Sequence, residues 1–188
     1  MKPPSPTNST ALLVIDVQND FMEGGALGIA NASHILPVVN ERIASGDYRL
    51  IVATQDMHPE DHVSFGIWPP HCVRNTRGAE LHPGLLKDRV HILWRKGIEA
   101  AVDSYGAFLD NDGRSTHLAD LLKASGIIAV DIVGLATDYC VGNTALQAAA
   151  HFKTRVLMRG CKGVGVKPDD IPAMVEKMRA AGVEIIAE

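Results

Sequence analysis

Short apolar runs alternate with helix-like segments along this chain, and this alternation is the feature that most constrains the fold. Alternating strands and helices are typical of a parallel sheet that is covered by helices on both faces. We therefore predict an α/β fold, a three-layer α/β/α arrangement around a mostly parallel six-stranded sheet. The expected strands are residues 11–15, 49–54, 90–94, 127–134, 155–158 and 183–186, and the expected helices are residues 32–44, 115–125, 141–152 and 169–181.

Length and composition indicate an ordinary globular chain. Its 188 residues suit one domain. Apolar residues make up 46% and charged residues 21%, which excludes the intrinsically disordered class. We predict a single domain over residues 11–188, preceded by a flexible N-terminal tail at residues 1–10. The tail is polar and rich in proline, and it lacks the apolar stretch of a secretory signal.

The net charge and the cysteine content indicate which kinds of partner the protein binds and in which cellular compartment it works. The net charge of −4 gives no basic footprint for nucleic acid, and the apolar runs are too short to span a membrane. Three cysteines, without a CxxC pair, do not suit a disulfide framework, so we expect a cytoplasmic protein. The expected partner is a small-molecule substrate. The oligomeric state stays open, with a homo-oligomer among the alternatives.

Four reactive side chains each follow a predicted strand. They are Asp16, Asp56, Lys96 and Cys140. Ligands of open parallel sheets bind beyond the carboxyl ends of the strands, so four neighbouring strands would bring these groups into one cleft. For any single member, a solvated loop residue or a buried filler is the ordinary interpretation. The set as a whole favours a catalytic site.

Cys140 precedes a predicted helix, where unpaired N–H groups and the helix dipole favour a thiolate and can hold an oxyanion. A thiolate nucleophile needs a proton acceptor and a charge partner. Asp16 can accept the thiol proton and return it to a leaving amine, and Lys96 can supply the positive charge. These three residues are our candidates for nucleophilic catalysis.

A carboxylate and several histidines cluster after the second predicted strand. Asp56 and His58 are two residues apart and point the same way in an extended segment, and His62 and His71 follow closely. Carboxylate and imidazole ligands suit one divalent ion, with zinc favoured over iron and manganese. The alternative is that several of them are turn residues, because the segment also contains Pro59.

Three aromatic residues, Phe21, Trp68 and Tyr105, lie in predicted loops near these groups. Flat side chains around a cleft suit a flat aromatic ligand, although simple packing would also explain each of them.

Taken together, these stretches resemble the nicotinamidase (pyrazinamidase) branch of the isochorismatase-like cysteine hydrolases. The strand-end acid, lysine and cysteine match the wider superfamily, and the Asp-x-His and Trp-Pro-x-His segments match the nicotinamidase branch. The matching segments are residues 16–21, 24–25, 54–59, 68–73, 96–97, 103–105 and 134–141.

This resemblance implies a metal-dependent cysteine amidohydrolase that converts nicotinamide to nicotinic acid and ammonia through a thioester, and that also accepts pyrazinamide. Family members often carry a cis peptide bond before the residue that matches Ala136. The implied roles are Cys140 as nucleophile with Asp16 and Lys96, the N–H groups of Ala136 and Cys140 as oxyanion hole, Asp56, His58 and His71 as metal ligands with His62 as a fourth, and Phe21, Trp68 and Tyr105 as pocket walls.

Some positions depart from the family pattern. Met57 replaces a frequent aromatic residue, and Gly106 replaces a frequent serine. These changes leave the pocket shape open, so a related amidohydrolase with another small amide or carbamoyl substrate is the main alternative. A catalytically silent binding protein is a further one.

Overall fold

A computed structural model describes residues 9–187. The predicted tail at residues 1–10 therefore lies outside the described residues except for its last two members. Ser9 accepts a backbone hydrogen bond from Ile128, and Thr10 begins the first strand. The first strand thus begins one residue before the apolar run at residues 11–15 from which it was predicted.

One sheet forms the centre of the molecule, and all of its neighbouring strands are parallel. This confirms the predicted α/β class and the six strands. The strands are, in spatial order, β3 (Ile92–Lys96), β2 (Leu50–Asp56), β1 (Thr10–Ile15), β4 (Ala129–Leu135), β5 (Lys153–Lys162) and β6 (Glu184–Ile186).

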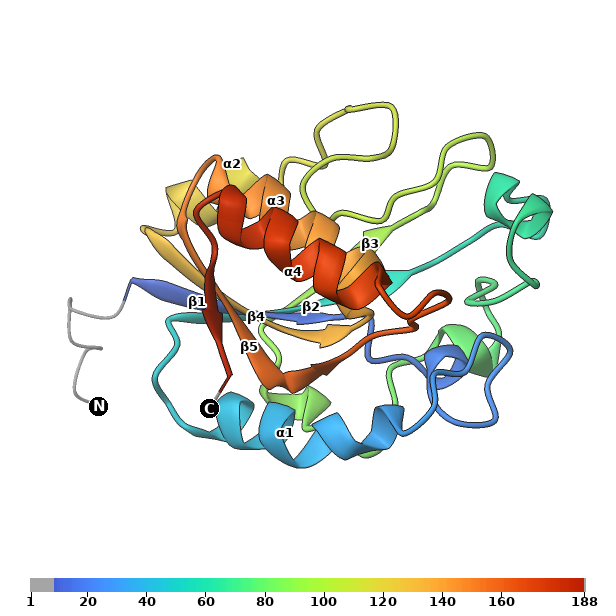
Figure 1. Ribbon diagram of the computed structural model, residues 1–188, viewed down its shortest axis with the longest axis horizontal. Helices are drawn as coiled ribbons and strands as arrows, with labels where there is room; N and C mark the ends of the chain where they lie inside the picture. The colour runs from blue at the N-terminus through green and yellow to red at the C-terminus, as the bar shows by residue number, and fades with distance from the viewer. Residues whose placement is uncertain (1–8, 188) are drawn as a thin grey trace.

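Helices cover both faces of this sheet and make the expected three layers (Figure 1). The helix α1 (Leu36–Ala44) lies on one face; α2 (Leu118–Ala124), α3 (Gly142–Ala149) and α4 (Asp170–Ala180) lie on the other. Short 3-10 helices occupy the connections, at Asn19–Phe21, Ala32–Ile35, Val63–Gly66, Arg77–Ala79 and Lys87–Arg89, and one π-helical turn spans Thr137–Val141.

The central strand β1 shows how the sheet divides the core. Its side chains alternate between the two faces. Leu12 and Val14 belong to the apolar cluster under α1, whereas Leu13 and Ile15 belong to the cluster under the other three helices. All four are fully buried. A strand covered on both faces needs a continuous apolar run, as the sequence has here.

Most elements differ by a few residues from the sequence-based expectation. The helix predicted at residues 32–44 begins as a 3-10 helix and becomes α-helical only at Leu36, and the one predicted at residues 141–152 ends at Ala149. The strand β5 extends to Lys162, past the predicted end at residue 158, and its pairing with β4 shifts register between Ile132 and Gly134. Charged residues such as Arg159 interrupt the apolar pattern there, but backbone pairing continues. The helix α2 begins only at Leu118, because His117 before it adopts a left-handed conformation with φ 67°.

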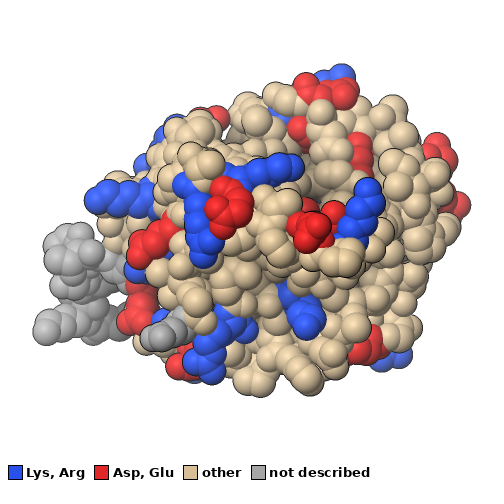
Figure 2. All heavy atoms as spheres, in the orientation of Figure 1, with Lys and Arg blue, Asp and Glu red and all other residues tan. Residues whose placement is uncertain are grey.

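Between residues 9 and 187, the structure contains no helix that is both long and apolar enough to cross a membrane. On the face shown in Figure 2, acidic and basic side chains are interspersed.

Candidate active site

The sheet order brings the four predicted strand ends together. Strands β3, β2, β1 and β4 are consecutive neighbours, and all point the same way. Asp56 and Lys96 close β2 and β3, and Asp16 and Cys140 follow β1 and β4. Asp16 adopts a left-handed backbone with φ 49°, which is uncommon for a residue with a side chain and marks a locally constrained turn.

Lys96 lies at the centre of this group. Its ammonium nitrogen is 2.9 Å from Asp16 Oδ2, 2.6 Å from Asp56 Oδ1 and 3.5 Å from Cys140 Sγ. It also donates to the Ser104 carbonyl oxygen at 2.9 Å. The Lys96 side chain is completely buried. The two carboxylates hold the pKa of Lys96 well above its usual value against the opposing effect of burial, so the buried ammonium is charged.

Asp16 is positioned as a buried acid or base beside the thiol. Thr54 Oγ1 donates to Asp16 Oδ1 at 2.6 Å and accepts the Asp16 backbone N–H at 3.0 Å. Burial raises the pKa of the Asp16 carboxyl, although Lys96 acts in the opposite direction. A carboxyl group with a raised pKa is suited to exchange a proton near neutral pH.

Cys140 lies in the π-helical turn that precedes α3, so helical structure begins at Thr137, before the predicted start at residue 141. Such turns occur frequently at functional sites. Burial raises the pKa of the Cys140 thiol well above its usual value, and Lys96 only partly opposes this effect. The thiol therefore needs a base to become a nucleophile. The peptide bond between Leu135 and Ala136 is cis, as the family resemblance implied.

A second set of side chains fits a divalent metal ion. Ligand atoms of Asp56, His58 and His71 all lie within 4.8 Å of one another. His58 Nδ1 lies 2.9 Å from the Gly97 carbonyl oxygen, and His71 Nδ1 lies 2.8 Å from that of Pro69. A carbonyl oxygen can only accept, so both histidines carry their hydrogen on Nδ1 and offer Nε2 as ligand atom.

Burial lowers the pKa of His58 to about 4, which keeps its imidazole neutral, as ligation requires. Carboxylate oxygen with two imidazole nitrogens is a donor set for zinc, iron or manganese. The residues present therefore fit the predicted metal.

His62 lies next to this set but belongs to a different grouping. Its ring stacks on that of His58 with centroids 3.9 Å apart. Its ligand atom groups with those of His58 and Asp103 rather than with Asp56 and His71. The sequence did not show whether His62 or His71 would share a metal ion with Asp56 and His58, because both histidines follow His58 within the same loop segment.

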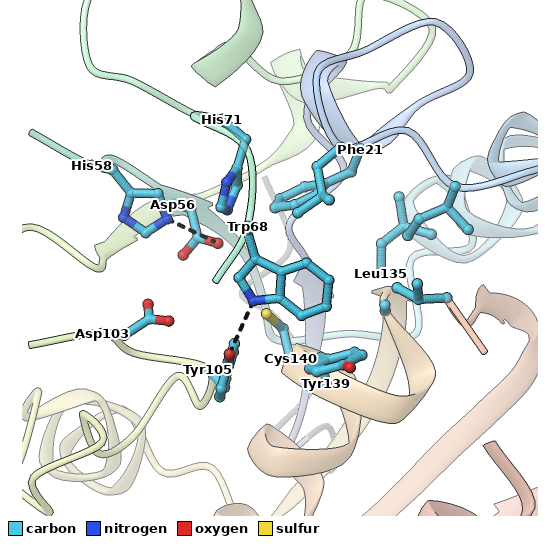
Figure 3. Close-up of a pocket in the computed structure, with 14 residues that line it drawn as sticks. Phe21, Asp56, His58, Trp68, His71, Asp103, Tyr105, Leu135, Tyr139 and Cys140 are labelled. Carbon is cyan, nitrogen blue, oxygen red and sulfur yellow. Dashed lines mark hydrogen bonds and ion pairs between the residues drawn. The ribbon is translucent and has the colours of Figure 1, made fainter. Parts of the chain in front are cut away.

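The predicted aromatic residues Phe21, Trp68 and Tyr105 all line one pocket together with Cys140 and the Asp56, His58 and His71 set (Figure 3). Trp68 Nε1 donates to the Tyr105 hydroxyl oxygen at 3.2 Å, which fixes both side chains. The pocket thus has aromatic walls, a thiol on one side and a metal-type donor set on another.

Other residues of the pocket wall were not predicted. Tyr139 packs edge-on against Trp68 with ring centroids 5.3 Å apart, and its position next to Cys140 could have indicated this. Val164 arrives from the loop after β5, which no local pattern connects to the site. The further unpredicted lining residues are Leu27, Ile29, Asp103 and Leu135.

Asp138 explains how that distant loop is held. Its carboxylate accepts the backbone N–H groups of Val164 and Gly165, each at 2.8 Å. The turn that carries Cys140 and the loop that carries Val164 are therefore fastened to one another.

Comparison with known proteins agrees with this geometry. The isochorismatase domain model matches residues 10–187. The chain belongs to the isochorismatase family. A nicotinamidase from Acinetobacter baylyi is 39% identical to this family member, over 96% of this chain and 93% of that protein.

Two solved structures of the family are also close in shape. A protein from L. infantum in complex with nicotinate superimposes with a TM-score of 0.91 at 36% identity, covering 95% of this chain and 92% of that one. A pyrazinamidase from Pyrococcus horikoshii in complex with zinc has a TM-score of 0.85 at 41% identity, covering 96% of this chain and 99% of that one.

Proposed function

We propose that this chain is a metal-dependent amidohydrolase that converts nicotinamide to nicotinic acid and ammonia, with Cys140 as nucleophile and pyrazinamide as a further substrate. The observation that carries the proposal is the Lys96 ammonium, which lies 3.5 Å from Cys140 Sγ and 2.9 Å from Asp16 Oδ2, while Cys140 itself lines an aromatic pocket. The names of the similar proteins, a nicotinamidase and a pyrazinamidase, support this substrate class.

The predicted metal ligands support a substrate that contains a pyridine-type ring. Asp56, His58 and His71 would hold the ion, and we include His62 as a candidate fourth ligand. The ion would supply a Lewis acid that binds a ring nitrogen. Zinc is favoured, because the related pyrazinamidase structure contains it.

In the first half of the reaction, Asp16 accepts the thiol proton and the Cys140 sulfur attacks the amide carbon. The raised pKa of Asp16 suits this step, and Lys96 stabilises the thiolate through its charge. The backbone N–H groups of Ala136 and Cys140 are the proposed donors to the oxyanion, and both residues line the pocket. The C–N bond then breaks, Asp16 returns the proton to the nitrogen, and ammonia leaves a Cys140 thioester.

In the second half, Asp16 takes a proton from water, whose oxygen attacks the thioester carbon. The C–S bond breaks, the carboxylic acid is released, and the proton returns to the Cys140 sulfur. Phe21, Trp68 and Tyr105 contact the ring and limit the water that reaches the site.

The test is ammonia release from nicotinamide, pyrazinamide and a small panel of other amides and carbamoyl compounds. We expect turnover of the first two and none in the Cys140→Ala variant, because that side chain is the only proposed nucleophile. Cys161→Ala is the matched control and should retain activity, since Cys161 does not line the pocket. Full activity of Cys140→Ala would refute the role of Cys140, and turnover of a carbamoyl compound alone would favour the related amidohydrolases.

A further inference from the structure

Asp103 is a partly buried acidic residue on the pocket wall that the reaction proposed above does not use. In Figure 3 it lies beneath His58 and Asp56, beside the same pocket. Its ligand atom lies within 4.8 Å of those of His58 and His62. A carboxylate with two imidazoles is again a donor set for a divalent transition ion.

The two donor sets share His58, and this limits how they can be used. His58 Nδ1 is committed to the Gly97 carbonyl oxygen at 2.9 Å, so Nε2 is its only free ligand atom. One nitrogen lone pair binds one ion at a time. The sets therefore describe two mutually exclusive positions for a single ion, an inner one at Asp56, His58 and His71 and an outer one at His58, His62 and Asp103.

Charge favours the participation of Asp103. Asp56 is 2.6 Å from the Lys96 ammonium, which Asp16 also contacts at 2.9 Å, so much of the charge of Asp56 is already compensated. Asp103 Oδ1 accepts a neutral donor, the Ser104 backbone N–H at 2.7 Å. When all are ionised, the carboxylates of Asp16, Asp56 and Asp103 and the Lys96 ammonium sum to a formal charge of −2, which one divalent cation would compensate.

His62 can serve the outer position with a change of tautomer. Its Nδ1 lies 2.7 Å from Ser64 Oγ, and its Nε2 lies 3.3 Å from the Val102 carbonyl oxygen. His62 Nδ1 also accepts the Ser64 backbone N–H at 3.3 Å. In the ligating tautomer Nδ1 gives up that contact and donates to Ser64 Oγ, and Nε2 exchanges its long contact with the Val102 carbonyl oxygen for the metal.

We infer that Asp103 belongs to the metal site of this protein, forming with His58 and His62 a second position that the ion occupies in alternation with the inner one. The inference rests on the proposed metal-dependent function and adds a carboxylate that none of the proposed roles includes. It assigns His62 to the outer position, where it meets the ion through a different partner set from Asp56 and His71.

Metal binding, measured without substrate, tests the inference. Zn²⁺ or Co²⁺ affinity is determined by competition with a chromophoric chelator for the wild-type chain and for Asp103→Asn. Asparagine keeps an oxygen for the Ser104 N–H but removes the charge, so the fold should persist, as circular dichroism can check. We expect one ion per wild-type chain and, if the two positions are equally occupied, an affinity about twofold weaker in Asp103→Asn, because the inner position remains available to the ion. Asp112→Asn is the control, because it removes an exposed carboxylate from the same loop.

A second variant isolates the outer position. His71→Ala damages only the inner set, so it should still bind one ion, and His71→Ala/Asp103→Asn should lose that binding. Equal affinities of Asp103→Asn and Asp112→Asn, no binding by His71→Ala, or two ions bound at once would each overturn the inference. A wild-type chain that binds no divalent ion would overturn the metal-dependent function as well. A metal affinity that is the same with and without the Asp103 carboxylate would overturn this inference alone.

Discussion

Lys96 is the side chain on which most of the proposed site depends. Its ammonium nitrogen lies 2.9 Å from the buried carboxylate of Asp16 and 2.6 Å from that of Asp56. Burying two like charges without a partner is costly, and breaking a buried ion pair from one side usually costs about 3–5 kcal/mol. The residue is thus both a stabilising charge for the fold and a candidate catalytic group.

We predict that Lys96→Met lowers the free energy of unfolding by about 3 kcal/mol or more and abolishes ammonia release. Urea titration followed by circular dichroism measures the first effect. Lys87→Met, at an exposed position, should change neither quantity measurably. A Lys96→Met protein as stable as the wild type would mean that at least one of the two carboxylates is protonated when Lys96 is absent.

At the scale of elements, α3 holds the loop that carries Tyr105. Gln147 of α3 accepts the backbone N–H groups of Phe108 and Leu109 at 3.0 Å each, and it donates to the Leu109 carbonyl oxygen at 3.2 Å. A side chain at Gly106 would collide with the Gln147 amide. The glycine that departs from the family pattern is therefore explained by the glutamine that fills its space.

This pairing predicts a coupled effect of two substitutions. Gly106→Ser should destabilise the protein by about 1–3 kcal/mol through overpacking and raise the KM for nicotinamide by displacing Tyr105. The double variant Gly106→Ser/Gln147→Ala should be less destabilised, and should show a smaller rise in KM, than the sum of the two single variants. A double-mutant cycle from urea unfolding and steady-state kinetics measures this coupling. Gly66→Ser, where a Cβ meets open space, is the control, and purely additive effects would contradict the pairing.

At the scale of the whole molecule, the proposed metal site ties together segments that only the folded chain brings close. Asp56 ends a central strand, and His71 lies in the long loop that returns beside it, where His58 pairs with Val73. The unfolded chain does not keep these ligands together. An ion that binds only the folded state must therefore raise the stability of the protein.

We predict that Zn²⁺ at 100 times its Kd stabilises the fold by about 2.7 kcal/mol, and that a chelator reverses the effect. For a chain of this size, each kcal/mol shifts Tm by about 2–4 °C. Thermal unfolding with and without the ion measures the shift. It should vanish in His58→Ala, which removes the ligand shared by both positions, and persist in His34→Ala, which replaces an exposed histidine. A shift of the same size in His58→Ala would contradict the proposed site.

The sequence by itself determined the fold class, the family and the positions of the strand-end residues. These follow from local features: apolar runs such as β1 must be buried on both faces, and a polar residue that ends such a run must lie at the sheet edge. The proximity of Asp16, Lys96 and Cys140 was expected on this basis, although their catalytic roles stay proposals.

Only the tertiary structure decided which of these groups touch. Lys96 meets Cys140 across 44 residues of sequence, and Val164 reaches the pocket from the loop after β5. The sharing of Lys96 between Asp16 and Asp56, and the grouping of His62 with Asp103, depend on strand order, register and loop path. These are set by the packing of the whole chain, because hydrophobic burial specifies which face a residue occupies but not which distant partner it meets there.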